Sequence, residues 1–252
     1  PDAEAWLEIT ETALTQTDSV LSSIKESLTT GASDDNTAED RQSILEDLSA
    51  LRDEIYAAGN ADYAGRTVFT GFRTGESLTF TEDTSSLYTI TETFSSSDVE
   101  CMTYISGGIN VNQSDLSNAN TEQDIQSNDV YRIRLAYDDL TNPQVDQAGN
   151  TLSGNILIDG TVLEVPAGTP VQVQTVSLTG DSSIDDTYYT SVGDDEVILI
   201  ADTGELILGA NVRDALQSTT GTISIEYAKS EFEEGDLRPE HYFTCTDGDS
   251  ID

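Results

Sequence analysis

The residues with the widest chemical repertoire are scarce in this chain. It has one histidine, His241, and two cysteines, Cys101 and Cys245, among 252 residues. Three residues separate His241 from Cys245, a spacing that can bring an imidazole and a thiolate to one metal or one nucleophilic centre. A zinc site needs three or four ligands, and no neighbour that would orient the histidine as a base can be identified. We therefore expect no catalytic residue, no metal site and no cofactor.

Carboxylates are so abundant in this chain that two of them close together do not by themselves indicate a catalytic or metal-binding site. The chain has 48 Asp plus Glu against 10 Lys plus Arg, a formal net charge of −38. Among so many acids, two neighbouring carboxylates do not indicate glycoside hydrolysis. Three acidic stretches are candidates for calcium, although none fits the EF-hand pattern: residues 181–186, 194–196 and 247–252. We expect a solvated acidic surface, which a halophilic source would also explain.

Charge and hydropathy also exclude several classes of partner. Binding to nucleic acid or to an anionic membrane needs a positive footprint, which this chain lacks. No apolar stretch approaches the roughly 18 residues that cross a bilayer. Residues 1–5 have neither the basic nor the apolar segment of a secretory signal peptide. We expect no nucleic-acid partner, no membrane partner and no cleaved signal peptide.

Apolar residues recur at helical spacing over the first 60 positions. One line of leucines repeats every seven residues: Leu7, Leu14, Leu21 and Leu28. Trp6, Ala13 and Val20 lie beside this line. After a polar loop at residues 31–36, a pattern close to a capping box at residues 37–40 starts a second helix. Its seam is Ile44, Leu48, Leu51 and Ile55. We predict an antiparallel helical hairpin, with these two sets of residues as candidates for core or subunit packing.

After Gly59 the pattern changes to short β-prone segments separated by turn residues. The predicted strands are residues 66–72, 78–80, 86–94, 99–105, 130–137, 156–158, 161–165, 171–176, 187–191, 196–200, 205–208 and 222–227. We also predict a loop at residues 110–129 and a short helix at residues 211–217. This spacing favours a small β-sandwich or barrel-like module, in which the strands at 130–137 and 222–227 could be neighbours.

The fold class that follows is α+β, with an N-terminal antiparallel helical hairpin and β-rich domains after it. We expect four parts along the chain. They are the hairpin of a core domain at residues 1–66, a β-hairpin and strands of the core or a connecting region at 67–129, an inserted outer β-domain at 130–228, and a segment returning toward the core at 229–252.

One segment of the chain resembles a known family. Residues 57–74 read AAGNADYAGRTVFTGFRT. They are similar to the Asn…Tyr-x-Gly-x-x-x-Phe-x-Gly-x-x-Thr signature of the bacterial flagellar hook-associated protein 3 family, the hook–filament junction proteins, and more loosely to flagellins. The residues that carry the signature are Asn60, Tyr63, Gly65, Phe69 and Gly71. The resemblance extends over about residues 2–74.

The resemblance implies an axial structural protein of the extracellular flagellum, with no enzymatic role. It implies export by the flagellar type III apparatus with an export chaperone. The implied partners are copies of the chain itself in a ring, another hook-associated protein and flagellin. Helices from both chain ends form an inner tube in this family, and a returning helix packs on the hairpin. We therefore expect a central fragment, in which part of the leucine line lacks its native partner.

Two other functions remain open at this point. A filament flagellin-like subunit belongs to the same structural class and differs in forming long filaments. An acidic surface adhesin or carbohydrate-binding module belongs to another class. It would present exposed aromatic side chains in a shallow groove, with Tyr131, Tyr188 and Tyr189 as candidates.

Overall fold

The computed structural model describes residues 2–33, 35–106, 126–178 and 187–247, and the chain divides into two compact units. The helical unit comprises residues 1–84 and 232–242, and the β unit comprises residues 85–231 and 243–252. A helical hairpin is followed by β-rich sheets, so the predicted α+β class is confirmed. None of the helices in the described ranges is both long and apolar enough to cross a membrane.

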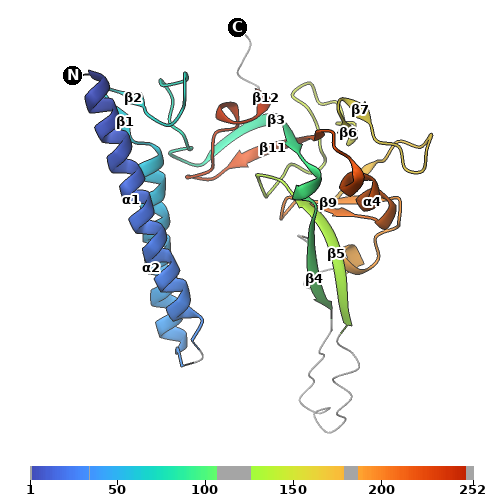
Figure 1. Ribbon diagram of the computed structural model, residues 1–252, viewed down its shortest axis with the longest axis horizontal. Helices are drawn as coiled ribbons and strands as arrows, with labels where there is room; N and C mark the ends of the chain where they lie inside the picture. The colour runs from blue at the N-terminus through green and yellow to red at the C-terminus, as the bar shows by residue number, and fades with distance from the viewer. Residues whose placement is uncertain (1, 34, 107–125, 179–186, 248–252) are drawn as a thin grey trace. The chain divides into compact units, whose positions relative to one another are not determined.

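The helical unit is built around two long helices that lie side by side (Figure 1). They are α1 (Asp2–Gly31) and α2 (Ala38–Gly59). Thr37 caps α2: its Oγ1 accepts a hydrogen bond from the Asp40 amide at 3.2 Å, and the Asp40 carboxylate accepts one from the Thr37 amide at 3.0 Å. This reciprocal pair confirms the predicted capping box. The Thr37 hydroxyl, which donates to the Asp40 carboxylate at 2.8 Å, and the Thr37 amide together lower the pKa of Asp40.

Residues 232–242 return to α2 and complete the helical unit. Gly235 has a φ of +99°, and a Cβ at this position would lie 1.9 Å from a ring carbon of Tyr56 in α2. Only glycine can follow the chain there, because it tolerates positive φ and has no Cβ. The Gly235 amide donates to the Phe80 carbonyl at 2.9 Å, and the Phe80 and Phe232 rings lie 4.7 Å apart. The short helix η2 (Pro239–His241) follows.

Two five-stranded sheets form the framework of the β unit. The first has the order β4 (Glu100–Ser106), β5 (Gln126–Arg134), β10 (Glu205–Leu208), β9 (Val197–Ile200) and β8 (Val173–Val176). The second has the order β12 (Thr244–Asp247), β3 (Thr84–Phe94), β11 (Ile223–Phe232), β6 (Ile156–Ile158) and β7 (Thr161–Val162). Strands β8 and β9 run parallel. The hairpin β1 (Asp62–Tyr63) and β2 (Arg66–Thr67) belongs to the helical unit.

The core of the β unit follows from its most apolar strands. Every residue of β9 and β10 is buried, which is the pattern of strands covered on both faces. The helix α4 (Ala210–Ser218) buries Val212 and Leu216, four residues apart on one face. The predicted helix at 211–217 is therefore confirmed. Two shorter helices are η1 (Ser96–Asp98) and α3 (Thr187–Thr190).

Two predicted β features of the β unit are wrong. Residues 187–191 were expected as a strand but contain α3, because Tyr188 and Tyr189 both pack on one core cluster instead of alternating across a sheet. The segments 130–137 and 222–227 are not neighbours. Strand β5 pairs with β4 and β10, whereas β11 lies between β3 and β6 in the other sheet.

The connecting region also differs from expectation. The strand predicted at 66–72 is reduced to Arg66–Thr67, since Gly71 has a φ of +63° and starts a turn. The segment 78–80 forms only an isolated bridge between Thr79 and Leu237. The end of the predicted loop at 110–129 belongs to β5, and residues 107–125 and 181–186 lie outside the described residues.

Candidate subunit-packing site

The two apolar lines of α1 have different environments. The line that faces α2 contains the small residues Ala13, 4% exposed, and Val20, 3% exposed. The leucine line beside it is largely exposed. The values are 67% for Leu7, 57% for Leu14, 53% for Leu21 and 56% for Leu28. Small residues let two helices approach closely, so the seam of the hairpin uses Ala13 and Val20.

Threonines of α1 take part in the same seam. Thr10 and Thr17 are half-buried, and each donates its hydroxyl to the carbonyl four residues earlier, at 2.8 and 2.9 Å. This back-bonding satisfies the hydroxyls within α1, so α2 need not supply polar partners. On α2 the four predicted seam residues are all half-buried: Ile44, Leu48, Leu51 and Ile55. The structure thus brings the α2 line against α1 and leaves most of the leucine line uncovered in this chain.

The family signature begins with a side-chain clamp at the end of α2. Asn60 is the C-cap residue, and its amide hydrogen-bonds back to carbonyls of α2. Its side-chain Nδ2 donates to Thr79 Oγ1 at 2.8 Å, and its Oδ1 accepts from the Thr79 amide at 3.0 Å. Thr79 is only 5% exposed, so these two bonds satisfy groups that water does not reach. Asn60 therefore fastens the segment after the signature to the helix end.

The next signature residues form a tight hairpin. Tyr63 pairs with Arg66 in β1 and β2, and Ala64 and Gly65 between them have φ values of 53° and 76°. Two consecutive positive φ values make a type I′ turn, the two-residue connection that matches strand twist. The Asp62 carboxylate accepts a hydrogen bond from the Gly65 amide at 2.9 Å. Glycine adopts such a positive φ without steric cost, which explains its place in this turn.

An aromatic contact joins this hairpin to the start of α1. Trp6 and Tyr63 meet edge to face with ring centroids 6.4 Å apart, and the Arg66 guanidinium lies 5.7 Å from the Trp6 ring. These side chains, with Gly71, line an open groove of about 490 Å³ in the helical unit. The contact fixes the position of the turn against α1, because edge-to-face rings and a cation over indole are both favourable.

The signature ends in a second turn. Thr70 is buried and donates its hydroxyl to the Arg73 carbonyl at 3.0 Å, while the Arg73 amide donates to the Thr70 carbonyl at 3.1 Å. Phe69 is half-buried, and Phe72 in the turn is 93% exposed. All five signature residues therefore lie in one compact structure after α2. The exposed Phe72 and the partners Trp6 and Thr79 were not singled out as site residues from the sequence.

Residues 1–74 match the family model of the bacterial flagellin N-terminal helical region. The match covers both helices and the whole signature, and it supports a flagellin-like family and a flagellar structural subunit. Such subunits assemble with copies of themselves and with other axial proteins outside the cell. No curated protein and no solved structure matches the chain. The flagellin-like assignment therefore rests on residues 1–74.

The aromatic residues considered for glycan binding are engaged in contacts within the β unit. The Tyr189 ring stacks on Tyr104 at 4.6 Å, and its hydroxyl donates to Glu205. The Arg213 guanidinium lies 4.5 Å from the Tyr131 ring. Tyr188 is half-buried against the core cluster that contains Ile198 and Ile207. These contacts explain the residues by packing within the β unit, and Tyr131 and Tyr189 also line an open groove of about 220 Å³.

The other chemical candidates are dispersed. Cys101 and Cys245 lie on β4 and β12, which belong to different sheets, and they form no disulfide with each other. The carboxylate of Asp195 accepts from Asn211 at 2.7 Å, and that of Glu196 accepts from the Gly193 amide at 3.2 Å. The acidic stretch at 194–196 is thus tied into the loop before β9.

Proposed function

We propose that this chain is a structural subunit of the bacterial flagellum that forms the junction between hook and filament. The observation that carries the proposal is the flagellin-type region at residues 1–74. It ends in a turn whose residues resemble the signature of the hook-associated protein 3 family. Asn60, Tyr63 and Gly65 each have a defined structural role in that turn. The signature, more than the helices, favours the junction over the filament.

The leucine line of α1 supports an assembly role. Four exposed leucines at seven-residue spacing form one apolar face along the helix. An exposed apolar face of this kind marks an interaction site, and we propose that a helix from the rest of the protein or from a neighbouring subunit covers it. The subunit would pack in a ring with copies of itself, next to flagellin and another hook-associated protein.

The remaining parts of the proposal follow from the same family. The protein would have no enzymatic activity, and it would reach the cell exterior through the flagellar export apparatus with an export chaperone. We propose that residues 130–228 form an outward-facing domain. The acidity of the chain, at a net charge of −38, suits a surface exposed to water.

Deletion of the gene, with complementation by the full-length protein, tests this function. Electron microscopy should show hooks without filaments, and flagellin should accumulate in the medium. Complementation should restore filaments. Normal filaments in the deletion strain would contradict the proposal. Loss of the filament protein itself, without shed flagellin, would indicate a filament subunit.

A further inference from the structure

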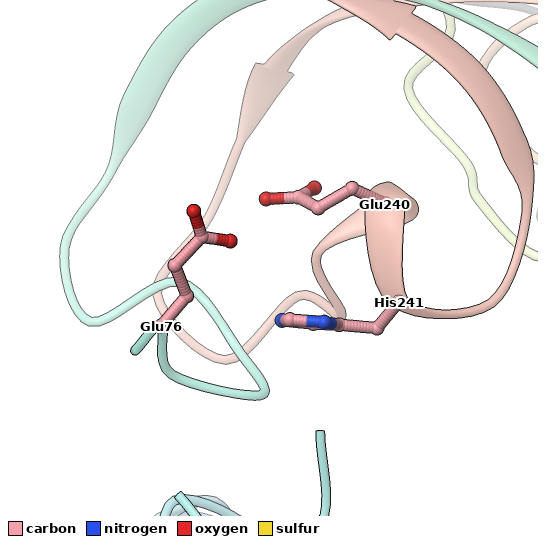
Figure 2. A group of neighbouring side chains, drawn as sticks. All are labelled: Glu76, Glu240 and His241. Atoms are coloured by element: carbon pink, nitrogen blue, oxygen red, sulfur yellow. The ribbon is translucent and has the colours of Figure 1, made fainter. Parts of the chain in front are cut away.

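Three side chains of the helical unit converge on one point, and we propose that they bind a divalent transition metal, with Zn²⁺ as the best fit. They are Glu76, Glu240 and His241, and one ligand atom of each lies within 4.8 Å of the others. Figure 2 shows Glu240 and His241 extending from η2 toward Glu76. Cysteines play no part in this site, unlike the His241–Cys245 pair considered from the sequence.

His241 is oriented as a metal ligand. Its Nε2 lies 2.8 Å from the carbonyl oxygen of Ser77. A carbonyl only accepts, so Nε2 carries a proton, and in the neutral ring Nδ1 holds a lone pair. Nδ1 is buried and has no hydrogen-bond partner among the described residues. Metal-binding histidines are commonly fixed by such a bond from the other ring nitrogen to a carbonyl.

Glu240 supplies a second buried atom that needs a partner. Its side chain is 8% exposed, and Oε1 accepts a hydrogen bond from Arg238 Nε at 2.8 Å. The other oxygen, Oε2, is buried without a hydrogen-bond partner in the part of the chain that the structure describes. A carboxylate oxygen removed from water without a partner is unfavourable. A cation between Oε2 and His241 Nδ1 would satisfy both atoms.

The donor set selects the class of metal. Imidazole favours zinc and neighbouring transition metals, whereas Mg²⁺ and Ca²⁺ prefer oxygen ligands alone. Three protein ligands leave one tetrahedral position for water. Glu76 is exposed, so its side chain can rotate to complete the site. The ion would connect the segment after the signature turn to η2, two parts of the helical unit that are far apart in sequence.

Metal titration of the chain tests the proposal. The protein is treated with EDTA, dialysed, and titrated with zinc chloride by calorimetry in excess Mg²⁺, which occupies weak acidic sites. We expect one Zn²⁺ per chain and a melting temperature that rises with Zn²⁺ concentration. His241→Ala and Glu76→Gln should each weaken binding at least about 100-fold. Because Glu76 is exposed, its substitution leaves the fold intact and isolates the effect on the ligand set.

Matched controls separate this site from incidental binding. Glu82→Gln removes the same charge at an exposed position of the helical unit and should bind Zn²⁺ like the unmodified chain. Cys245→Ser should also retain binding. Equal affinity in the Glu76, Glu82 and His241 variants would mean adventitious ions on an acidic surface and would overturn the proposal. No zinc binding by the unmodified chain would overturn it as well.

Discussion

The leucine line of α1 should matter for assembly and little for the folding of this chain. Leu14 is 57% exposed, so Leu14→Ala removes less than half the burial of a core leucine, whose truncation costs about 2–5 kcal/mol. Alanine also has the higher helix propensity. We expect the free energy of unfolding of the chain to fall by less than about 1 kcal/mol.

Val20 is the matched control on the same helix. It is 3% exposed and lies in the seam with α2, so Val20→Ala removes buried methyl groups and leaves a small cavity. We expect a loss of about 2 kcal/mol. Urea unfolding of the two variants, followed by circular dichroism, should therefore rank Val20→Ala as the more destabilised, although it loses fewer atoms.

Loss of the exposed leucines should affect assembly much more than it affects the stability of the chain. Each exposed leucine leaves on the order of 100 Å² for a partner helix to cover, worth about 2 kcal/mol. The double variant Leu14→Ala/Leu21→Ala should then weaken that contact by about 4 kcal/mol, or roughly a thousandfold in affinity. Full-length protein with both changes should fail to restore swimming in soft agar. Normal swimming, or a destabilisation by Leu14→Ala as large as that by Val20→Ala, would refute this reasoning.

Three further predictions concern the stability of the chain, each measured by denaturant unfolding. Asn60→Ala should cost about 1–3 kcal/mol, because it leaves the Thr79 amide buried without its partner. Gly235 and Gly71 both have positive φ, but only at Gly235 would a Cβ lie against a ring, that of Tyr56. Gly235→Ala should therefore cost about 3 kcal/mol or more, and Gly71→Ala only about 1 kcal/mol. Burial raises the pKa of Glu92, so the chain should lose stability as the pH rises from the ordinary glutamate pKa through the folded-state value. Glu92→Gln should flatten that loss at pH values above the ordinary glutamate pKa of about 4, and an unchanged pH profile would contradict the assignment to this residue.

Local signals explain what the sequence predicts well. The capping box at Thr37 depends only on adjacent residues, and it appears as expected. The turn at Gly65 likewise depends on short-range geometry, whereas the turn at Gly71 lies within the segment 66–72 that the sequence predicts as a strand. The helix at 211–217 follows from the four-residue spacing of its buried residues.

The features that the sequence does not predict depend on contacts between residues far apart in the chain. A heptad of leucines indicates a partner helix but not which one, and here the seam with α2 uses the small residues Ala13 and Val20 instead. The neighbours of β5 and β11 depend on pairings between distant segments, which a periodic pattern does not encode. The convergence of Glu76 with Glu240 is hidden for the same reason, because the two residues lie far apart in the chain.

Immunogold labelling of the full-length protein on isolated flagella tests the central claim most directly. A hook–filament junction subunit should give a single band of gold where the hook meets the filament. Labelling along the whole filament would contradict the junction role and indicate a filament subunit. Labelling of the cell surface away from flagella would contradict a flagellar function altogether.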